Sequence, residues 1–167
     1  MCQRVDRLHS GGGALKRTVV TVGLALWGAM LATPQAAAEG RSFRLEGLRS
    51  DELRPAELLQ GAVIVIVWAS WSPRCRDIVE RSNAIVDRWG DRARVLTVVF
   101  QEDRETVERF LAGQRPRAPV YLDRDGAFSK KHAVTHLPGL LIFKDGVTGF
   151  SGRLPNNPHS LIEQTLG

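Results

Sequence analysis

The chain has 167 residues, its composition is 43% apolar and 25% charged, and its formal net charge at pH 7 is +5. A chain of this length forms one ordinary domain with a single core. It contains no internal repeat or low-complexity tract, and its arginines are interspersed with acids, as in the segment 87–94. That mixture is typical of a solvated face and not of a basic stripe that binds nucleic acid, so we expect no nucleic-acid partner.

The first 38 residues have the pattern of an export signal. Lys16 and Arg17 form a basic flank, residues 19–32 are apolar, and three alanines at 36–38 fit a small-residue cleavage site. The apolar region has 14 residues, fewer than the roughly 20 needed to span a bilayer. We predict a signal peptide at 1–38 and a periplasmic or otherwise extracytoplasmic domain at 39–167. The alternative is an uncleaved anchor, which would be the only contact with a membrane.

Removing this segment changes both the charge and the cysteine count. Four of the 23 basic residues and one of the 18 acidic residues lie in it, so the remaining 129 residues carry a net charge of +2. Cys2 also lies in it, which leaves Cys75 as the single thiol and excludes an intramolecular disulfide. In an oxidising compartment a lone thiol is either buried and inert or exposed and able to pair with another molecule.

Apolar periodicity and turn residues divide the chain into alternating strands and helices. We predict strands at 42–47, 63–67, 95–99, 119–122, 140–143 and 147–154. We predict a short helix within 50–60, with Ser50 as a cap and Pro55 limiting its length. We predict further helices at 73–89, 103–113, 127–134 and from 158 or 159 onward. Alternation with short links favours parallel strands joined by right-handed crossovers, whereas Asp145-Gly146 indicates a hairpin. The predicted fold class is α/β.

The most informative stretch joins a buried strand to the start of a helix. Residues 63–67 are an unbroken β-branched run, the pattern of a strand covered on both faces. Ser72 is placed to supply an N-cap oxygen, and Pro73 suits the first helical position. Cys75 is therefore expected in the first turn of a helix. The helix dipole and the arginines on either side would stabilise a thiolate there, whereas burial would oppose it.

The segment Trp68-Ala69-Ser70-Trp71-Ser72-Pro73-Arg74-Cys75 resembles the W-A-x-W-C-x-P-C segment of thioredoxin-fold proteins, most closely the exported TlpA/ResA-like thiol-disulfide oxidoreductases. The resemblance extends over nearly all of the chain beyond the signal. It implies a three-layer α/β/α sandwich, whose mixed central sheet has a parallel βαβ half and a C-terminal β-hairpin plus helix. One departure is decisive. The family's first cysteine, its exposed nucleophile, falls on Ser72, and its second, resolving cysteine falls on Cys75.

A second, separate segment supports the resemblance. Leu137-Pro138 resembles the family's cis-proline before the hairpin, and residues 140–146 resemble its apolar strand and turn. An ordinary trans proline is the alternative. In the resembling fold the proline loop faces the cysteine motif, so the resemblance implies a groove between them that binds a protein or peptide partner. The residues expected to line it are Trp71, Pro73, Arg74, Leu137 and Pro138.

Two positions lack what dithiol exchange needs. One thiolate must attack a disulfide, and a second thiol must release the mixed disulfide that forms. The hydroxyl of Ser72 is neutral at physiological pH and forms no disulfide, so we predict a helix-capping role for it. Ile66 lies two residues before Trp68, where the resembling proteins often have a buried polar or acidic side chain that assists proton transfer. An isoleucine cannot accept a proton.

The sequence indicates neither a metal site nor a cofactor. His132 and His136 are four residues apart, but no further histidine or cysteine completes a set of ligands. We expect both histidines on the surface, with His136 at the rim of the groove.

Three functions remain in competition. The first, which we favour, is a redox-degenerate binding or assembly factor of the envelope thiol-disulfide system that holds an extended polypeptide in the groove. The second is a monothiol oxidoreductase in which Cys75 forms mixed disulfides with a thiol protein or a small thiol. The third is a transferase-like use of Ser72 to orient a thiol such as glutathione, although the extra helical domain of such enzymes is missing.

Overall fold

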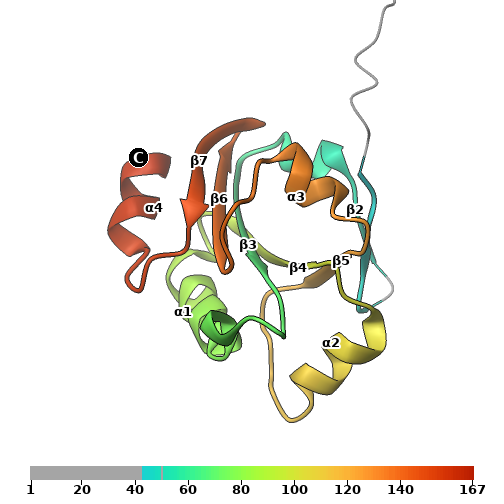
Figure 1. The fold of residues 1–167 in the computed structure, drawn as a ribbon. Coiled ribbons are helices and arrows are strands. Elements are labelled where there is room, and N and C mark those ends of the chain that lie inside the picture. The colour runs from blue at the N-terminus through green and yellow to red at the C-terminus, as the bar shows by residue number, and fades with distance from the viewer. Residues whose placement is uncertain (1–42, 50) are drawn as a thin grey trace, which may run out of the picture. The chain divides into compact units, whose positions relative to one another are not determined.

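The computed structural model describes residues 43–49 and 51–167, and Figure 1 shows their arrangement. The predicted signal peptide at 1–38, Cys2 and the predicted cap Ser50 lie outside these residues. Within the described ranges, no helix has both the length and the apolar content needed to cross a membrane.

The described residues form one seven-stranded mixed sheet with the strand order β2-β1-β5-β4-β3-β6-β7. The three central strands β3, β4 and β5 are parallel, and the other neighbouring pairs are antiparallel. The strands are β1 (Leu45–Gly47), β2 (Glu52–Leu53), β3 (Ala62–Trp68), β4 (Arg94–Phe100), β5 (Val120–Asp123), β6 (Gly139–Lys144) and β7 (Val147–Arg153).

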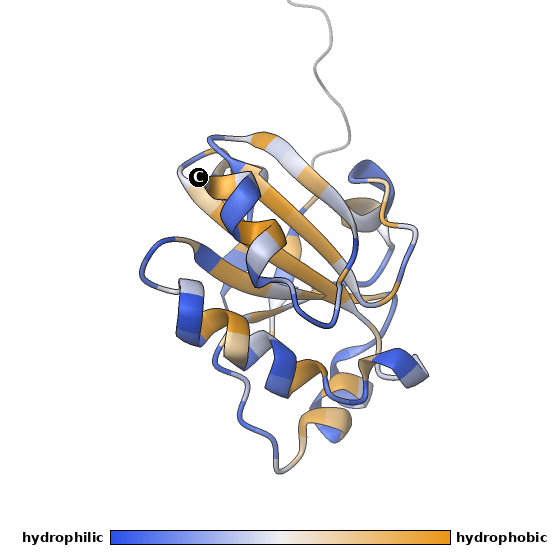
Figure 2. Cartoon of the chain, turned by 90° about the vertical axis from the view of Figure 1, so that its left-hand side faces the viewer, coloured by the Kyte–Doolittle hydropathy of each residue, from blue (hydrophilic) through white to orange (hydrophobic). Residues whose placement is uncertain are grey.

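Helices cover both faces of this sheet. On one face, α1 (Ile78–Trp89), α2 (Arg104–Leu111) and α4 (His159–Leu166) contribute to one apolar cluster, which includes the alternate β3 residues Ile64 and Ile66. On the other face, α3 (Ala127–Lys131) and the short 3-10 helix η1 (Pro55–Leu58) contribute to a second cluster with Val63 and Val65. Figure 2 shows apolar strands between helices whose outer sides are hydrophilic. The predicted three-layer α/β/α sandwich is therefore correct.

The β-branched run explains why β3 is the centre of this arrangement. Residues 63–68 are buried without interruption, because β4 and β6 pair with the two edges of β3 while helices cover its two faces. Each side chain of the run thus enters one of the two apolar clusters, as expected for a strand in the middle of a layered α/β domain. Five predicted strands, those from 63–67 onward, are correct to within one residue at each end.

The short helix predicted within 50–60 is present only in part. The segment forms β2 and then η1, which begins at Pro55. Leu53 pairs with Leu45 across the sheet and is fully buried. Pairing in the sheet requires an extended backbone, so a helix cannot start before Pro55. The apolar spacing of this segment was compatible with either structure.

His132 is not a surface residue, contrary to the sequence-based expectation. Its half-buried ring lies 4.6 Å from the ring centroid of Phe128, 5.2 Å from that of Phe143 and 5.8 Å from that of Phe43. Among the described residues its Nε2 atom has no hydrogen-bond partner. Burial lowers the pKa of His132 below its ordinary value of 6.5, and Lys131 lowers it further, while Asp123 partly opposes this.

This lowered pKa predicts a loss of stability in mild acid. Below pH 6.5 the unfolded chain takes up a proton at His132 before the folded chain does, so the free energy of unfolding falls as the pH drops. The test measures the free energy of unfolding in urea at pH 7.5 and at pH 5, roughly one unit above and more than one unit below that ordinary value. We expect the difference between the two free energies to be smaller for His132→Phe than for the wild type. The exposed loop residue His136, changed to Gln, is the control. An unchanged difference in His132→Phe would contradict the assignment.

Candidate functional site

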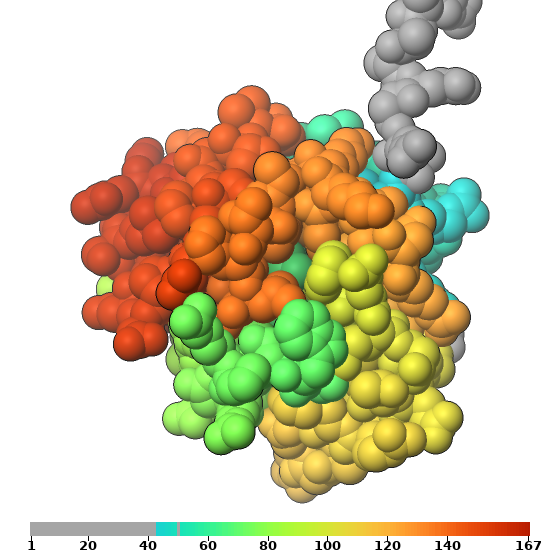
Figure 3. Space-filling model, in the orientation of Figure 1, coloured from blue at the N-terminus to red at the C-terminus, as the bar shows by residue number. Residues whose placement is uncertain are grey.

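The candidate site lies where the central parallel strands end. The carboxyl ends of parallel strands meet at one edge of a sheet, and loops that follow them are common positions for ligand sites in α/β folds. After β3 the chain continues through residues 69–72 into a 3-10 turn, η2 (Pro73–Cys75), and then into α1. The segment before β6, residues 132–138, approaches the same edge. Figure 3 shows the green segment after β3 lying against this orange segment.

The turn differs from the expected helix start. Regular α-helix begins only at Ile78, and Ser72 makes no cap hydrogen bond through its side chain. The backbone N–H of Cys75 instead donates to the carbonyl oxygen of Ser72 at 2.9 Å. The N–H of Cys75, which a capping serine hydroxyl would accept from, therefore already has a partner, and Pro73 has no N–H. The predicted capping role of Ser72 is wrong.

Cys75 is completely buried. Its exposed fraction is 0%, and it belongs to the apolar cluster that contains Trp68 and Ile78. Ser72, at the position of the family's nucleophile, is 6% exposed. Arg74 and Arg76 point into solvent, and no hydrogen bond to the Cys75 sulfur is present in the described part of the chain. A thiol that solvent and reagents cannot reach reacts slowly whatever its ionisation.

Ile66 lies in the same apolar cluster as Cys75 and is fully buried. It pairs with Thr97 of β4 and Leu140 of β6 in the sheet. The resembling proteins often have a proton-accepting group at this position. Here the side chain is a hydrocarbon that lies in the apolar core.

A carboxylate that the sequence analysis overlooked holds the loop between β3 and the turn. Glu102 follows β4 and is 8% exposed. Its Oε2 atom accepts a hydrogen bond from the backbone N–H of Ser70 at 2.7 Å, and its Oε1 atom accepts one from the Ser70 hydroxyl. Because β3 and β4 are parallel neighbours, an acid just after β4 faces the loop just after β3. An acid directly after the second predicted parallel strand was therefore the feature of the sequence that could have indicated Glu102.

The predicted groove residues meet in two adjoining hollows. The first, which we call the Trp71 hollow, has a volume of about 430 Å³ and is lined by Trp71, Ser72, Pro73, Arg74, Thr135 and Leu137. The indole of Trp71 is 62% exposed there. Pro138 is buried and lines the second hollow, which shares Pro73 and Arg74 with the first. The Leu137–Pro138 peptide bond is cis.

The two histidines do not come together at this site. His136 is exposed in the loop before Pro138, where its Nδ1 lies 2.9 Å from the Thr135 hydroxyl. His132 belongs to the aromatic cluster described above. In the described residues, no group of three or more histidine, cysteine or acidic side chains is arranged to hold a metal ion.

Comparison with known proteins identifies the fold. No family model matches the chain, and no curated protein matches it significantly. A putative thiol:disulfide interchange protein DsbE from Chlorobium tepidum superposes with a TM-score of 0.66 at 21% identity, covering 77% of this chain and 95% of that one. The exposed lipoprotein thioredoxin Etrx1 from Streptococcus pneumoniae gives 0.65 at 20% identity, with 74% and 97% covered.

A secreted disulfide oxidoreductase from Mycobacterium tuberculosis, homologous to Escherichia coli DsbE, gives a TM-score of 0.60 at 15% identity and covers 77% of this chain and 98% of its own. These similarities extend over nearly the whole of each solved structure. At such low identities they establish the fold, which is the thioredoxin fold of thiol-disulfide oxidoreductases. The fold predicted from the sequence motifs is confirmed.

The burial of Cys75 predicts slow alkylation. In the purified protein we expect iodoacetamide to modify Cys75 at least about tenfold more slowly in the folded state than in urea, equivalent to about 1.4 kcal/mol of protection. Thr135→Cys, which places a thiol on the exposed rim, is the matched control and should react quickly in the same preparation. Equal rates for Cys75 in folded and unfolded protein would show that the thiol is accessible.

The geometry of the turn predicts that a second cysteine at 72 would restore a disulfide. A 3-10 turn has about three residues per turn and a rise of about 2 Å per residue, so positions 72 and 75 lie one above the other about 6 Å apart. Disulfides join Cα atoms separated by about 4.4–6.8 Å. We expect oxidised Ser72→Cys to lose two hydrogen atoms by mass spectrometry as an internal bridge. Intermolecular dimers alone, as expected for Thr135→Cys, would contradict this geometry.

Proposed function

We propose that the protein is an exported binding or assembly factor that holds an extended polypeptide in the groove formed by Trp71, Pro73, Arg74, Leu137 and Pro138. The observation that carries this proposal is the state of the two motif positions. Position 72 has no thiol, and the thiol at position 75 is completely buried.

The chemistry of these positions argues against dithiol exchange. Ser72 cannot attack a disulfide, because its hydroxyl is neutral near pH 7 and forms no S–S bond. Cys75 would have to emerge from the apolar cluster before it could form a mixed disulfide with a partner. Ile66 offers no proton acceptor beside it. The monothiol alternative therefore requires the turn to open, whereas the binding function uses the surface as it stands.

The groove supports a binding function because it presents an exposed aromatic side chain, Trp71, on a loop that hydrogen bonds hold in place. Tryptophan is enriched among the few residues that contribute most of the binding energy at protein interfaces. Here Trp71 lies between Ser70, which Glu102 holds, and Ser72, whose N–H donates to the Ala69 carbonyl at 3.2 Å. A loop fixed in this way loses less conformational entropy on binding than a free loop does.

Export is part of the same proposal. The pattern at 1–38 supports it, and two of the structural neighbours are named as exposed or secreted proteins. We infer a periplasmic or other extracytoplasmic location within the envelope thiol-disulfide system, with a protein or peptide as the partner.

Insulin reduction and insulin B-chain binding together test the proposal. With an electron donor present, the purified protein should not accelerate insulin reduction, and Cys75→Ala should bind the S-alkylated B chain as the wild type does. Trp71→Ala should weaken binding by roughly tenfold or more, because truncating a tryptophan anchor costs about 2 kcal/mol or more. The alkylated chain has no thiol, so this binding cannot be covalent.

Two outcomes would overturn the proposal. Insulin reduction at the rate of a two-cysteine thioredoxin would show that the dithiol argument is wrong. Capture of the B chain by Cys75, formed when its thiolate attacks an interchain disulfide of oxidised insulin and releases the A-chain thiol, and lost in Cys75→Ala, would establish the monothiol function instead.

A further inference from the structure

The second hollow is strongly basic. Its volume is about 430 Å³, and it lies between the η2 turn, the start of α1 and the end of β7. Four arginine side chains and a single carboxylate line it. We call it the arginine hollow, and its charged residues are Arg74, Arg76, Asp77, Arg81 and Arg153.

Two of these charged residues have a structural task. Arg81 donates through Nη2 to the carbonyl oxygens of Leu154 at 3.2 Å and Pro155 at 3.0 Å. Its Nη1 atom lies 3.8 Å from Oδ1 of Asp77, and its side chain is only 18% exposed. Arg81 thus fastens the segment after β7 to α1. Its charge is partly compensated by Asp77, the one acid among the described residues that line the hollow.

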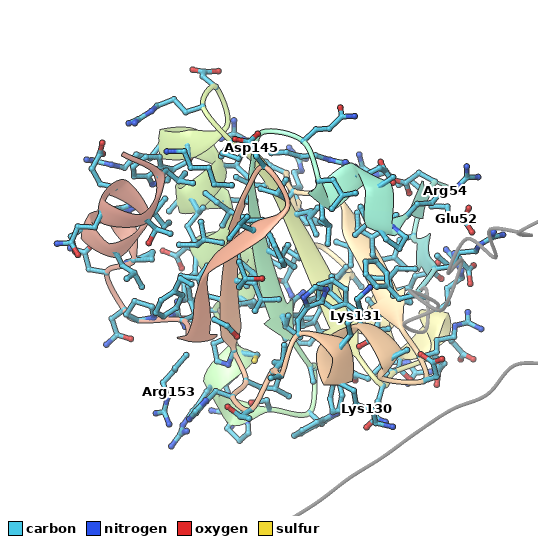
Figure 4. The ribbon with its side chains drawn as sticks, turned by 90° about the horizontal axis from the view of Figure 1, so that it is seen from above. Glu52, Arg54, Lys130, Lys131, Asp145 and Arg153 are labelled. Atoms are coloured by element: carbon cyan, nitrogen blue, oxygen red, sulfur yellow. The ribbon has the colours of Figure 1, made fainter. Side chains whose placement is uncertain are left out.

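The other three arginines are exposed and have no carboxylate partner among the described residues. What sets them apart is that they line one hollow together, whereas Arg92, Arg104 and Arg117 each pair with an acid. Figure 4 shows Arg153 projecting outward from the end of β7, on the side of the molecule where the turn lies. A hollow lined mainly by charges of one sign has a positive local potential, which attracts anions.

The chemistry of arginine narrows the choice of anion. A guanidinium group presents a planar fork of N–H donors that matches the oxygens of a carboxylate or a phosphate. The arginine hollow also adjoins the Trp71 hollow, because Pro73 and Arg74 line both. An occupant of the whole groove would therefore place an apolar group against Trp71 and anionic groups against Arg76 and Arg153.

We propose that the arginine hollow selects acidic polypeptide segments, binding aspartate or glutamate side chains that flank an apolar residue seated in the Trp71 hollow. The proposal rests on the peptide-binding function proposed above and adds its specificity. An extended chain supplies both kinds of group on one backbone. A small anion would fill only the arginine hollow.

The test uses two synthetic peptides with one central leucine each, flanked on both sides by glutamates in one peptide and by glutamines in the other. Each is titrated into the purified protein at low salt and followed by NMR, which reports the affinity and the residues perturbed. We expect the acidic peptide to bind about tenfold more tightly. We expect that advantage to shrink when the ionic strength is raised to about 0.5 M, because salt screens exposed charges.

Matched charge variants make the test specific. Arg76→Gln combined with Arg153→Gln should lower the affinity for the acidic peptide about tenfold and leave that for the glutamine peptide unchanged. Arg92→Gln combined with Arg109→Gln removes the same charge at arginines that pair with Glu163 and Glu105. This control should bind both peptides as the wild type does.

The outcomes separate this inference from the function on which it rests. If both peptides bind equally at the groove and the Arg76 and Arg153 changes have no effect, the acidic specificity is wrong and the binding function stands. If neither peptide perturbs the groove, both proposals fail. Loss of binding to vesicles of anionic phospholipid in the same double variant, without selectivity between the peptides, would assign the hollow to a membrane surface and overturn the inference.

Discussion

The burial of β3 on both faces and along both edges is the constraint on which the rest of the structure depends. A strand in that position has no freedom to shift its register, because a shift by one residue would exchange the side chains of the two apolar clusters. Its end at Trp68 therefore determines where the following loop leaves the sheet. The position of the turn with Ser72 and Cys75 is therefore fixed by the packing of β3 in the core.

Around that fixed point, the site is built from chain segments that are distant in sequence but adjacent at the sheet edge. Glu102 comes from the end of β4, the cis-proline segment precedes β6, and Arg153 ends β7. The parallel pairing of β3 with β4 and the antiparallel pairing of β3 with β6 bring them together. The surface next to the buried thiol thus combines an aromatic side chain with positive charge.

The parts of the fold that were predictable are those in which local pattern and tertiary environment agree. The β-branched run of β3 and the Asp145-Gly146 hairpin each have one stable interpretation. The segment 50–60 was ambiguous, because a two-residue strand is stabilised only by its partner β1. The predicted capping role of Ser72 is wrong for a related reason. The backbone carbonyl of Ser72, and not its hydroxyl, accepts the hydrogen bond from the N–H of Cys75. His132 escaped recognition because two of the aromatic rings around it, those of Phe43 and Phe143, come from distant parts of the chain. Glu102 could be recognised only once β3 and β4 were taken as parallel neighbours, since its partner Ser70 lies 32 residues away.

The complete enclosure of Cys75 has a consequence for how a bound polypeptide would be released. A protein that uses an exposed thiol can become trapped in a covalent adduct, and its cycle then depends on a reductant. Here the sulfur is shielded by the turn that forms the floor of the groove. A client with unpaired cysteines could dissociate by simple equilibrium, at a rate independent of the redox potential of its surroundings.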